Sequence, residues 1–383
     1  MDILSGATTI STILSVGGTL NIWSNFTGTH HDYHAASSGA VINVMSGGTL
    51  SAGDVASGGT VNVTSDGVAS GTIVSGGGLL NISGVASGST VLSGGEIVLS
   101  SGGSTNIVNI SSGGTMDILS GATTISTILS VGGTLNIWSN FTGTHHDYHA
   151  ASSGAVINVM SGGTLSAGDV ASGGTVNVTS DGVASGTIVS GGGLLNISGV
   201  ASGSTALSGG EIVLSSGGST NIVNISSGGI FNILSGATTN NTILSAGGTL
   251  NIWNSFAAAH HDYHTASSGA VINVMSGGTL SAGDVASGGT INVTSDSVAS
   301  GTIVSGGGTM AVSGIISGTT LLSGGEATIS SGASSYSATI SSGAVFSILS
   351  GGTTSSTILS AGGTLNIGNT FRAIHNDNQT ASS

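Results

Sequence analysis

Aliphatic and polar residues alternate in short runs along the whole chain. In each run of five residues the second and fourth are aliphatic, whereas the first, third and fifth are mostly polar or variable, and the third is often Asn. This period of two predicts β-strands with one buried face and one outward face. The first six runs are 19–23, 41–45, 60–64, 79–83, 96–100 and 115–119.

A second kind of apolar run lies between these predicted strands and ends in a pair of glycines. Examples are 71–77, 89–95 and 126–133. Glycine suits a tight corner because it adopts positive φ without steric cost, which β-branched residues do not. We therefore predict at least two strands and two glycine-rich corners in each rung of a repeating structure.

The spacing of the runs predicts how the strands stack. Their starts are 17 to 22 residues apart, most often 19. A coil of this length, repeated without a helical pattern, predicts an all-β fold, a parallel β-solenoid with about nineteen residues per rung. The chain is long enough for about twenty rungs, and six rungs at roughly 4.8 Å per strand would cover about 29 Å.

A longer repeat of 115 residues is superimposed on the rungs. Full copies occupy 1–115, 116–230 and 231–345, a partial fourth copy occupies 346–383, and the first two are almost identical. Tandem copying on this scale is typical of an array in which each unit packs against the next. We expect a single continuous β-solenoid over 1–383, cut from a longer array.

Composition excludes several other classes of protein. Gly accounts for 70 of the 383 residues and Pro and Cys are absent, but hydrophobic residues make up 38%, which argues against a disordered linker. The formal net charge is −14 and Arg372 is the single Lys or Arg, which excludes nucleic-acid binding. No apolar run approaches the roughly eighteen residues that a membrane span needs, so we expect no span in this segment.

One segment interrupts the simple repeat. It follows the run 19–23, occupies the longest interval between strands and contains the sequence His-His-Asp-Tyr-His. Imidazoles and a carboxylate within five residues can ligate a divalent transition metal such as Zn²⁺, Ni²⁺ or Cu²⁺. The candidate ligands in the three full copies are His30, His31, Asp32, His34, His145, His146, Asp147, His149, His260, His261, Asp262 and His264.

Packing is the alternative interpretation of the same segment. Its aromatic residues can form a flap over the adjoining rungs or a contact between solenoids, and carbohydrate stacking on them is a third alternative. In the fourth copy only His375 and Asp377 remain of the cluster and Gly368 replaces the Trp, which weakens the metal hypothesis. We therefore expect a contact flap that requires no cofactor, with metal binding as the alternative. The flap residues are Trp23, Phe26, Tyr33, Trp138, Phe141, Tyr148, Trp253, Phe256 and Tyr263.

The turn motifs resemble those of a known family. Ser-Gly-Gly-Thr turns, as at 45–49, 56–60 and 110–115, alternate with short Val and Ile strands along essentially the whole chain. This pattern is similar to the passenger repeats of self-associating autotransporter adhesins, including the diffuse-adherence adhesin group of Gram-negative bacteria. The resemblance implies a right-handed β-solenoid outside the outer membrane that mediates adhesion and cell aggregation, with Ser/Thr glycosylation. The 115-residue repeat and the His-rich segment depart from the family pattern.

These observations favour a structural and adhesive function. We expect an extracellular or bacterial cell-surface rod or filament that mediates cell aggregation, biofilm formation or surface attachment through many contacts with identical rods or with a host or matrix surface. A periodic metal-binding scaffold is one alternative. A polysaccharide-active β-helix enzyme is another, but it is disfavoured because no catalytic motif is visible and basic residues are nearly absent. We predict no enzymatic activity.

Overall fold

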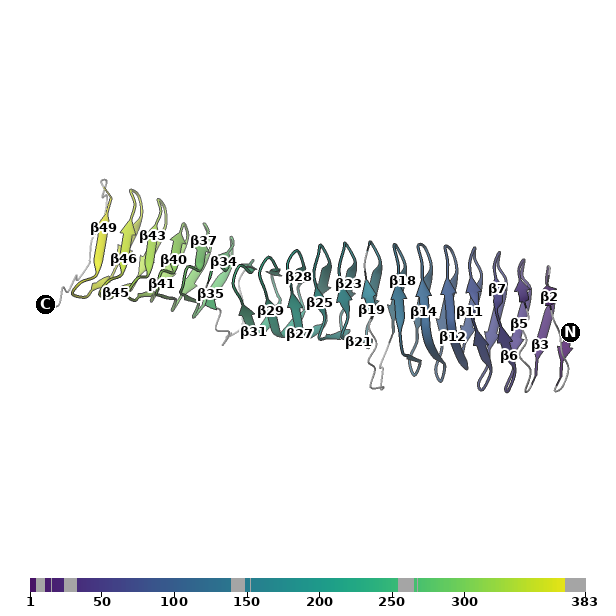
Figure 1. The fold of residues 1–383 in the computed structure, drawn as a ribbon. Coiled ribbons are helices and arrows are strands. Elements are labelled where there is room, and N and C mark those ends of the chain that lie inside the picture. The colour runs from purple at the N-terminus through teal and green to yellow at the C-terminus, as the bar shows by residue number, and fades with distance from the viewer. Residues whose placement is uncertain are drawn as a thin grey trace. The chain divides into compact units, whose positions relative to one another are not determined.

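The computed structural model describes residues 1–4, 11–14, 16–23, 33–138, 149–151, 153–253, 265–266 and 268–368. Within these ranges all regular elements are β-strands, and no helix capable of crossing a membrane is found there (Figure 1). The chain divides into two compact units, residues 1–188 with 192–195 and residues 189–191 with 196–383. Each unit is a parallel β-solenoid and is described by itself.

Each turn of the solenoid contains one four-residue strand and one bent segment. In a representative turn, β8 (Thr60–Val63) is followed by β9 (Val68–Ser70), and the chain then bends at Gly71, which has a φ of 63°. After the bend, β10 (Ile73–Val74) leads through a corner to β11 (Leu79–Ile82), which pairs in parallel with β8. The predicted parallel β-solenoid with about nineteen residues per turn is confirmed.

The four-residue strands form the first sheet, and neighbouring strands pair in parallel within each unit. In the first unit these strands are β1 (Asp2–Ile3), β3 (Thr19–Ile22), β5 (Val41–Val44), β8, β11, β13 (Glu96–Leu99), β15 (Thr115–Ile118), β18 (Thr134–Ile137), β20 (Val156–Val159) and β23 (Thr175–Val178). In the second unit they are β28 (Glu211–Leu214), β30 (Ile230–Ile233), β32 (Thr249–Ile252), β34 (Val271–Val274), β37 (Thr290–Val293), β40 (Thr309–Val312), β43 (Glu326–Ile329), β46 (Val345–Ile348) and β49 (Thr364–Ile367). In the sequence, β26 (Leu194–Ile197) spans the boundary between the units.

The bent segments form the opposite wall, named here the second sheet. Its strands in the first unit are β2 (Ser11–Leu14), β4 (Tyr33–Ala36), β6 (Thr49–Ser51), β7 (Gly53–Val55), β9, β10, β12 (Val85–Val91), β14 (Ser104–Ile110), β16 (Thr123–Thr124), β17 (Thr127–Leu129), β19 (His149–Ala151), β21 (Thr164–Ser166), β22 (Asp169–Val170) and β24 (Val183–Ser185). At the boundary between the units lies β25 (Ile188–Val189).

In the second unit the bent segments begin with three long strands and continue as two rows of short ones. The long strands are β27 (Val200–Ala206), β29 (Ser219–Ile225) and β31 (Thr238–Leu244). The strands before the bend are β35 (Thr279–Ser281), β38 (Val298–Ser300), β41 (Ile315–Ser317), β44 (Ser334–Tyr336) and β47 (Thr353–Ser355). Those after the bend are β33 (Thr265–Ala266), β36 (Asp284–Val285), β39 (Ile303–Val304), β42 (Thr320–Leu321), β45 (Thr339–Ile340) and β48 (Ile358–Leu359).

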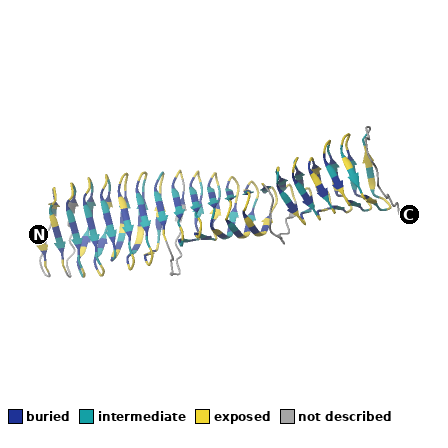
Figure 2. Ribbon diagram, turned by 180° about the vertical axis from the view of Figure 1, so that it is seen from behind, coloured by how far each residue is buried: buried dark blue, intermediate teal, exposed yellow. Residues whose placement is uncertain are grey.

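The core is built from the inward positions of both sheets. In the first sheet the second and fourth residues of each four-residue strand before β49 are buried, for example Val61 and Val63 in β8 and Leu80 and Ile82 in β11. The first and third residues are partly exposed, and the corners carry most of the fully exposed residues (Figure 2). The alternation expected from the sequence is therefore confirmed, and it gives the first sheet an apolar inner face.

The paired glycines at the corners meet two different requirements. Gly77 has a φ of 85°, and a Cβ on it would meet no atom closer than 3.7 Å. A Cβ on Gly78 would instead collide with the carbonyl oxygen of Val55 in the preceding turn. The first glycine thus supplies the left-handed backbone conformation, whereas the second lets successive turns stack closely.

The interior also contains hydroxyl groups. Thr72, Ser89 and Thr105 are almost completely buried, and their hydroxyls have no hydrogen-bond partner within the described part of the chain. Leaving such a group unsatisfied costs about 1–3 kcal/mol. An apolar side chain of the same shape at these positions is therefore expected to give the solenoid a higher free energy of unfolding.

Candidate contact surface

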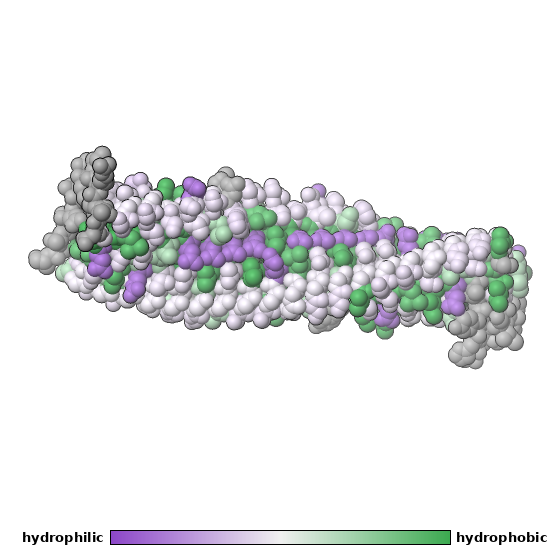
Figure 3. All heavy atoms as spheres, turned by 90° about the horizontal axis from the view of Figure 1, so that it is seen from above, coloured by the Kyte–Doolittle hydropathy of each residue, from purple (hydrophilic) through white to green (hydrophobic). Residues whose placement is uncertain are grey.

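Outward-facing asparagines on the first sheet form ladders of hydrogen bonds between turns. Asn62 donates from Nδ2 to Oδ1 of Asn43 at 2.9 Å, and Asn81 donates to Asn62 at 2.9 Å. The same arrangement recurs in the second copy, where Asn158 donates to Asn136 at 2.8 Å. Strongly hydrophilic residues run in a row along the surface in Figure 3 rather than being scattered over it. The ladders join successive turns through side chains in addition to the backbone bonds.

An acidic residue stands at the N-terminal head of each ladder. Asn136 donates to Asp117 at 2.7 Å, and Asp2 has the same role in the first copy. A carboxylate accepts hydrogen bonds but cannot donate them, so the amides that follow must direct their donors toward the N-terminal side. In the third copy Asn232 replaces this Asp and donates to Glu211 at 2.6 Å. The ladder there has the same number of asparagines as the first one, but it begins one turn earlier and on a different acid.

An exposed tryptophan follows a first-sheet strand once in every 115-residue copy. Trp23, Trp138 and Trp253 are 40 to 41% exposed. Their backbone N–H groups donate to carbonyls of the preceding turn at 2.8 to 2.9 Å, as strand residues would. The tryptophans are therefore fixed to the solenoid wall at equivalent places.

The residues that directly follow the first-sheet strands lie beside one another in successive turns and form a row along the solenoid. In this row each tryptophan lies between a leucine and a methionine. In the second copy, Leu119 occupies this row one turn before Trp138, because its N–H donates to Leu99 of the preceding turn. Met160 occupies it one turn later, because its N–H donates to Ile137, the residue before Trp138. We name each set of three a tryptophan step. The steps are Leu4, Trp23 and Met45; Leu119, Trp138 and Met160; and Leu234, Trp253 and Met275.

Polar residues occupy the same row in the turns between two steps. Thr64, Ser83 and Ser100 each donate their N–H to the preceding turn in the way that the tryptophans do. In the fourth copy Gly368 takes the tryptophan position, and its N–H donates to Ile348 at 2.8 Å. Apolar surface in this row is therefore confined to three of every six turns, and the row itself continues where the tryptophan is absent.

Most of the predicted metal ligands and flap residues lie outside the described residues. They are His30, His31, Asp32, His145, His146, Asp147, His260, His261, Asp262, His264, Phe26, Phe141, Tyr148, Phe256 and Tyr263. Tyr33 and His34 lie in β4 and His149 lies in β19, but their side chains are not described. Elsewhere in the described part of the chain no three His, Asp or Glu residues gather into a metal site. The metal site and the wider flap stay predictions.

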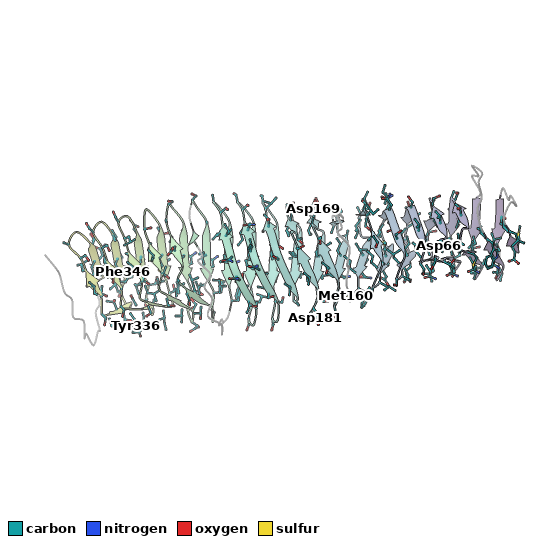
Figure 4. All side chains as sticks on the ribbon, turned by 90° about the horizontal axis from the view of Figure 1, so that it is seen from below. Asp66, Met160, Asp169, Asp181, Tyr336 and Phe346 are labelled. Carbon is teal, nitrogen blue, oxygen red and sulfur yellow. The ribbon has the colours of Figure 1, made fainter. Side chains whose placement is uncertain are left out.

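Carboxylates dominate the charge of the described surface. Arg372, the single Lys or Arg of the chain, lies outside it. Burial raises the pKa of the Asp284 carboxyl above its ordinary value. In Figure 4, Asp169 lies toward one side of the first unit, whereas Met160 and Asp181 lie toward the other. Met160 of the second tryptophan step and Asp169 of the second sheet are therefore on different sides of the first unit.

The leucine and methionine of each step were not expected as contact residues. The signal for them was present in the sequence, because the residue after each four-residue strand falls in one row, and Met45 is the next such residue after Trp23. Once strand pairing is in register, apolar residues at this position in successive runs must become neighbours. The row is therefore the candidate contact surface within the described residues.

No family model matches the chain, and no curated protein matches it either. Among solved structures it is similar to a TibC-catalysed, hyper-glycosylated fragment of TibA, residues 55–350, with 24% sequence identity. The match covers 97% of this chain and 96% of that chain, with a TM-score of 0.30. Structures with so low a TM-score do not superpose closely, so we take the fold from the strand pairing of this chain alone.

Proposed function

We propose that the chain is a structural and adhesive protein that acts outside the cell, by attaching to further copies of itself or to a host or matrix surface. The observation that carries this proposal is the tryptophan step. The three steps place an exposed Trp, with a Leu and a Met beside it, at equivalent positions of a row that carries Thr64, Ser83 and Ser100 in the turns between the first two steps. Apolar groups set at regular intervals along a row that is polar between them are suited to repeated contacts.

Repetition gives such contacts their strength. One tryptophan step offers a small apolar area, and a contact of that size is weak in isolation. When several steps of one chain meet a periodic partner, each later contact forms within an existing complex and at a high effective concentration. Attachment then depends steeply on the number of steps, which is a reason to copy a 115-residue unit with little change.

The proposal includes no catalytic step. The surface roles invoked are those of exposed apolar side chains and of the ladders that keep the wall regular. Glycosylation of outward Ser and Thr residues, which the family resemblance implies, is compatible with attachment and stays a prediction. Metal binding through the His-rich segments also stays a prediction.

The test replaces Trp23, Trp138 and Trp253 together by Ser. Serine occupies the same row at Ser83 and Ser100, so the variant is expected to fold with an unchanged far-UV circular dichroism spectrum. We expect slower self-association by light scattering and weaker attachment of labelled protein to bacterial cells or matrix-coated surfaces. A matched control replaces Thr64, Ser83 and Ser100 by Ala in the turns between steps and should leave both readouts unchanged. If the tryptophan variant attaches and associates like the original chain, the tryptophan steps are not the adhesive surface.

A further inference from the structure

A second periodic feature lies on the second sheet, in the strand that follows the bend. Thr72 and Val74 are buried, so the side chain of Ile73 between them points outward, and it is 38% exposed. Strand pairing places one residue of each turn in register with Ile73 and its equivalents. In the first unit this column, named here the isoleucine column, runs through Ile13, Ala35, Asp54, Ile73, Thr90, Asn109, Ile128, Ala150 and Asp169.

An isoleucine recurs in the column at every third turn. Ile13, Ile73 and Ile128 are 79, 38 and 48% exposed, and Ile188 follows one turn after Asp169, because its N–H donates to Gly168. At roughly 4.8 Å per turn, the isoleucines stand about 14 Å apart. The period of this surface is therefore half the period of the tryptophan steps.

The pairs of residues between the isoleucines alternate between two kinds, so that each kind recurs after six turns. After one isoleucine come Ala and Asp, and after the next come Thr and Asn, as in Asp54 before Ile73 and Asn109 before Ile128. If the column is compared with a copy of itself shifted by three turns along the solenoid, Ile therefore falls on Ile, Ala on Thr and Asp on Asn. A shift of zero or six turns superimposes Ile on Ile but also Asp on Asp.

We propose that the isoleucine column is a docking face for a second copy of this chain, with the two solenoid axes parallel and the copies staggered by three turns. This rests on the self-association included in the proposed function and names the face and the register. In the staggered register each Asp meets an Asn amide, which can donate a charge-assisted hydrogen bond to it. In the unstaggered register like charges face each other on an apolar surface, which is costly.

The second unit keeps the spacing of the isoleucines. Ile243, Ile303 and Ile358 are 54, 39 and 48% exposed, and the pairing of Asp284 with Ile303 repeats that of Asp54 with Ile73. Thr339 stands where Asn109 stands in the first copy, so a hydroxyl donor replaces the amide donor there. A Thr hydroxyl can also donate to an Asp, and the staggered register stays free of facing carboxylates.

A second copy fits this face better than an unrelated partner. The repeat distance of the partner must equal three turns of this solenoid, and another copy meets that condition within each unit. A basic partner would pair with Asp in every register and would give no reason for alternating Asp with Asn. The alternation is explained when the facing surface carries the same alternation.

Cysteine cross-linking tests both the face and the register, because the chain has no native Cys. A three-turn stagger places Ile73 of one copy opposite Ile128 of the other, and Ile128 opposite Ile188. We expect I73C mixed with I128C, and I128C mixed with I188C, to form disulfide dimers several-fold more efficiently than any of the three variants alone. An antiparallel complex allows only one of these mixtures to cross-link in a given register, so that result would overturn the proposal.

Removing the charge alternation gives a second test. The triple variant D54N, D169N, D284N no longer penalises the unstaggered register, so I73C in that background should begin to cross-link with itself. Self-cross-linking of I73C that is already efficient in the original background contradicts the proposed stagger. If no pair cross-links although light scattering shows association, this face is excluded and the proposed function stands. If the chain neither associates nor attaches to cells or matrix, the proposed function itself fails.

Discussion

The asparagine ladder should respond to substitution according to position, because its hydrogen bonds all run in one direction. Asn62 in the middle of a ladder both donates to Asn43 and accepts from Asn81, each at 2.9 Å. Asp117 at the head of the second ladder only accepts, from Asn136 at 2.7 Å. An exchange between Asn and Asp is therefore expected to cost more in the middle of a ladder than at its head.

The magnitudes follow from the bonds that each variant loses. Asn62→Ala removes both bonds of a half-buried residue, at about 1 kcal/mol each, for a total of about 2 kcal/mol. Asn62→Asp still accepts from Asn81 but places a carboxylate oxygen against the Asn43 oxygen, and we expect a loss of about 2–3 kcal/mol at neutral pH. Asp117→Asn replaces a charge-assisted bond by a neutral one and should cost about 1 kcal/mol.

Urea unfolding followed by far-UV circular dichroism at pH 7 and pH 3 is the assay. At pH 3, below the ordinary Asp pKa of about 3.9, the carboxyl introduced by Asn62→Asp is largely protonated and can donate to Asn43. The urea midpoint of this variant, relative to the original chain at the same pH, should therefore recover at pH 3, whereas that of Asn62→Ala should not. The comparison at equal pH controls for the other carboxylates of the chain.

Three results would refute this account. Equal midpoints for Asn62→Asp and the original chain at pH 7 would show that the donor bond to Asn43 contributes nothing. A midpoint for Asn62→Asp that does not recover at pH 3 would show that carboxylate repulsion is not the cause of its loss. A larger loss for Asp117→Asn than for Asn62→Asp would show that the ladder has no fixed donor direction.

Four further predictions concern single positions and the His-rich segments. Gly77→Ala should cost about 1–2 kcal/mol through its positive φ, whereas Gly78→Ala should cost more, because its methyl group collides with the preceding turn; urea midpoints would rank the two. Ile107 has a φ of 58°, which is strained for a β-branched residue, so Ile107→Gly should raise the midpoint, and an unchanged or lower midpoint would contradict the strain. Thr72→Val removes a buried, unpaired hydroxyl at nearly constant shape and should stabilise by about 1 kcal/mol; destabilisation would show that the hydroxyl is paired. If the His-rich segments bind metal, calorimetric titration with Zn²⁺ should show binding that is lost when their histidines are replaced by Ala, and the absence of heat in the original chain would exclude a Zn²⁺ site.

The sequence was sufficient to predict the wall of the solenoid because the alternation has a direct physical meaning. A buried aliphatic residue at every second position leaves few choices for the face of a strand, and Val61 and Val63 lie inside as expected. The Asn-rich outward column could also be foreseen. The direction of its hydrogen bonds could not, because it depends on which turn lies beside which, and on Asp117 being at the head of a ladder.

Other features depend on contacts between turns that the sequence does not display. The corner glycines were expected to supply positive φ, which holds for Gly77, but Gly78 is required by the carbonyl of the preceding turn. The outward isoleucines lie in runs that look apolar throughout, so the period of two is hidden by Thr72 inside and Ile73 outside. The chain bends at Gly71, and the position of this bend determines that Thr72 and not Ile73 faces the core.

The buried residues of the first sheet and the outward residues repeat with different periods along the solenoid. The interior of the first sheet repeats at every turn, and one turn of about nineteen residues satisfies it. A requirement for folding alone would therefore favour a repeat of one turn. The outward isoleucines repeat every three turns, and the tryptophan steps and the Asp and Asn alternation repeat every six. Since the buried positions of the first sheet do not need the six-turn unit, we infer that contacts made at the surface help to maintain the 115-residue repeat.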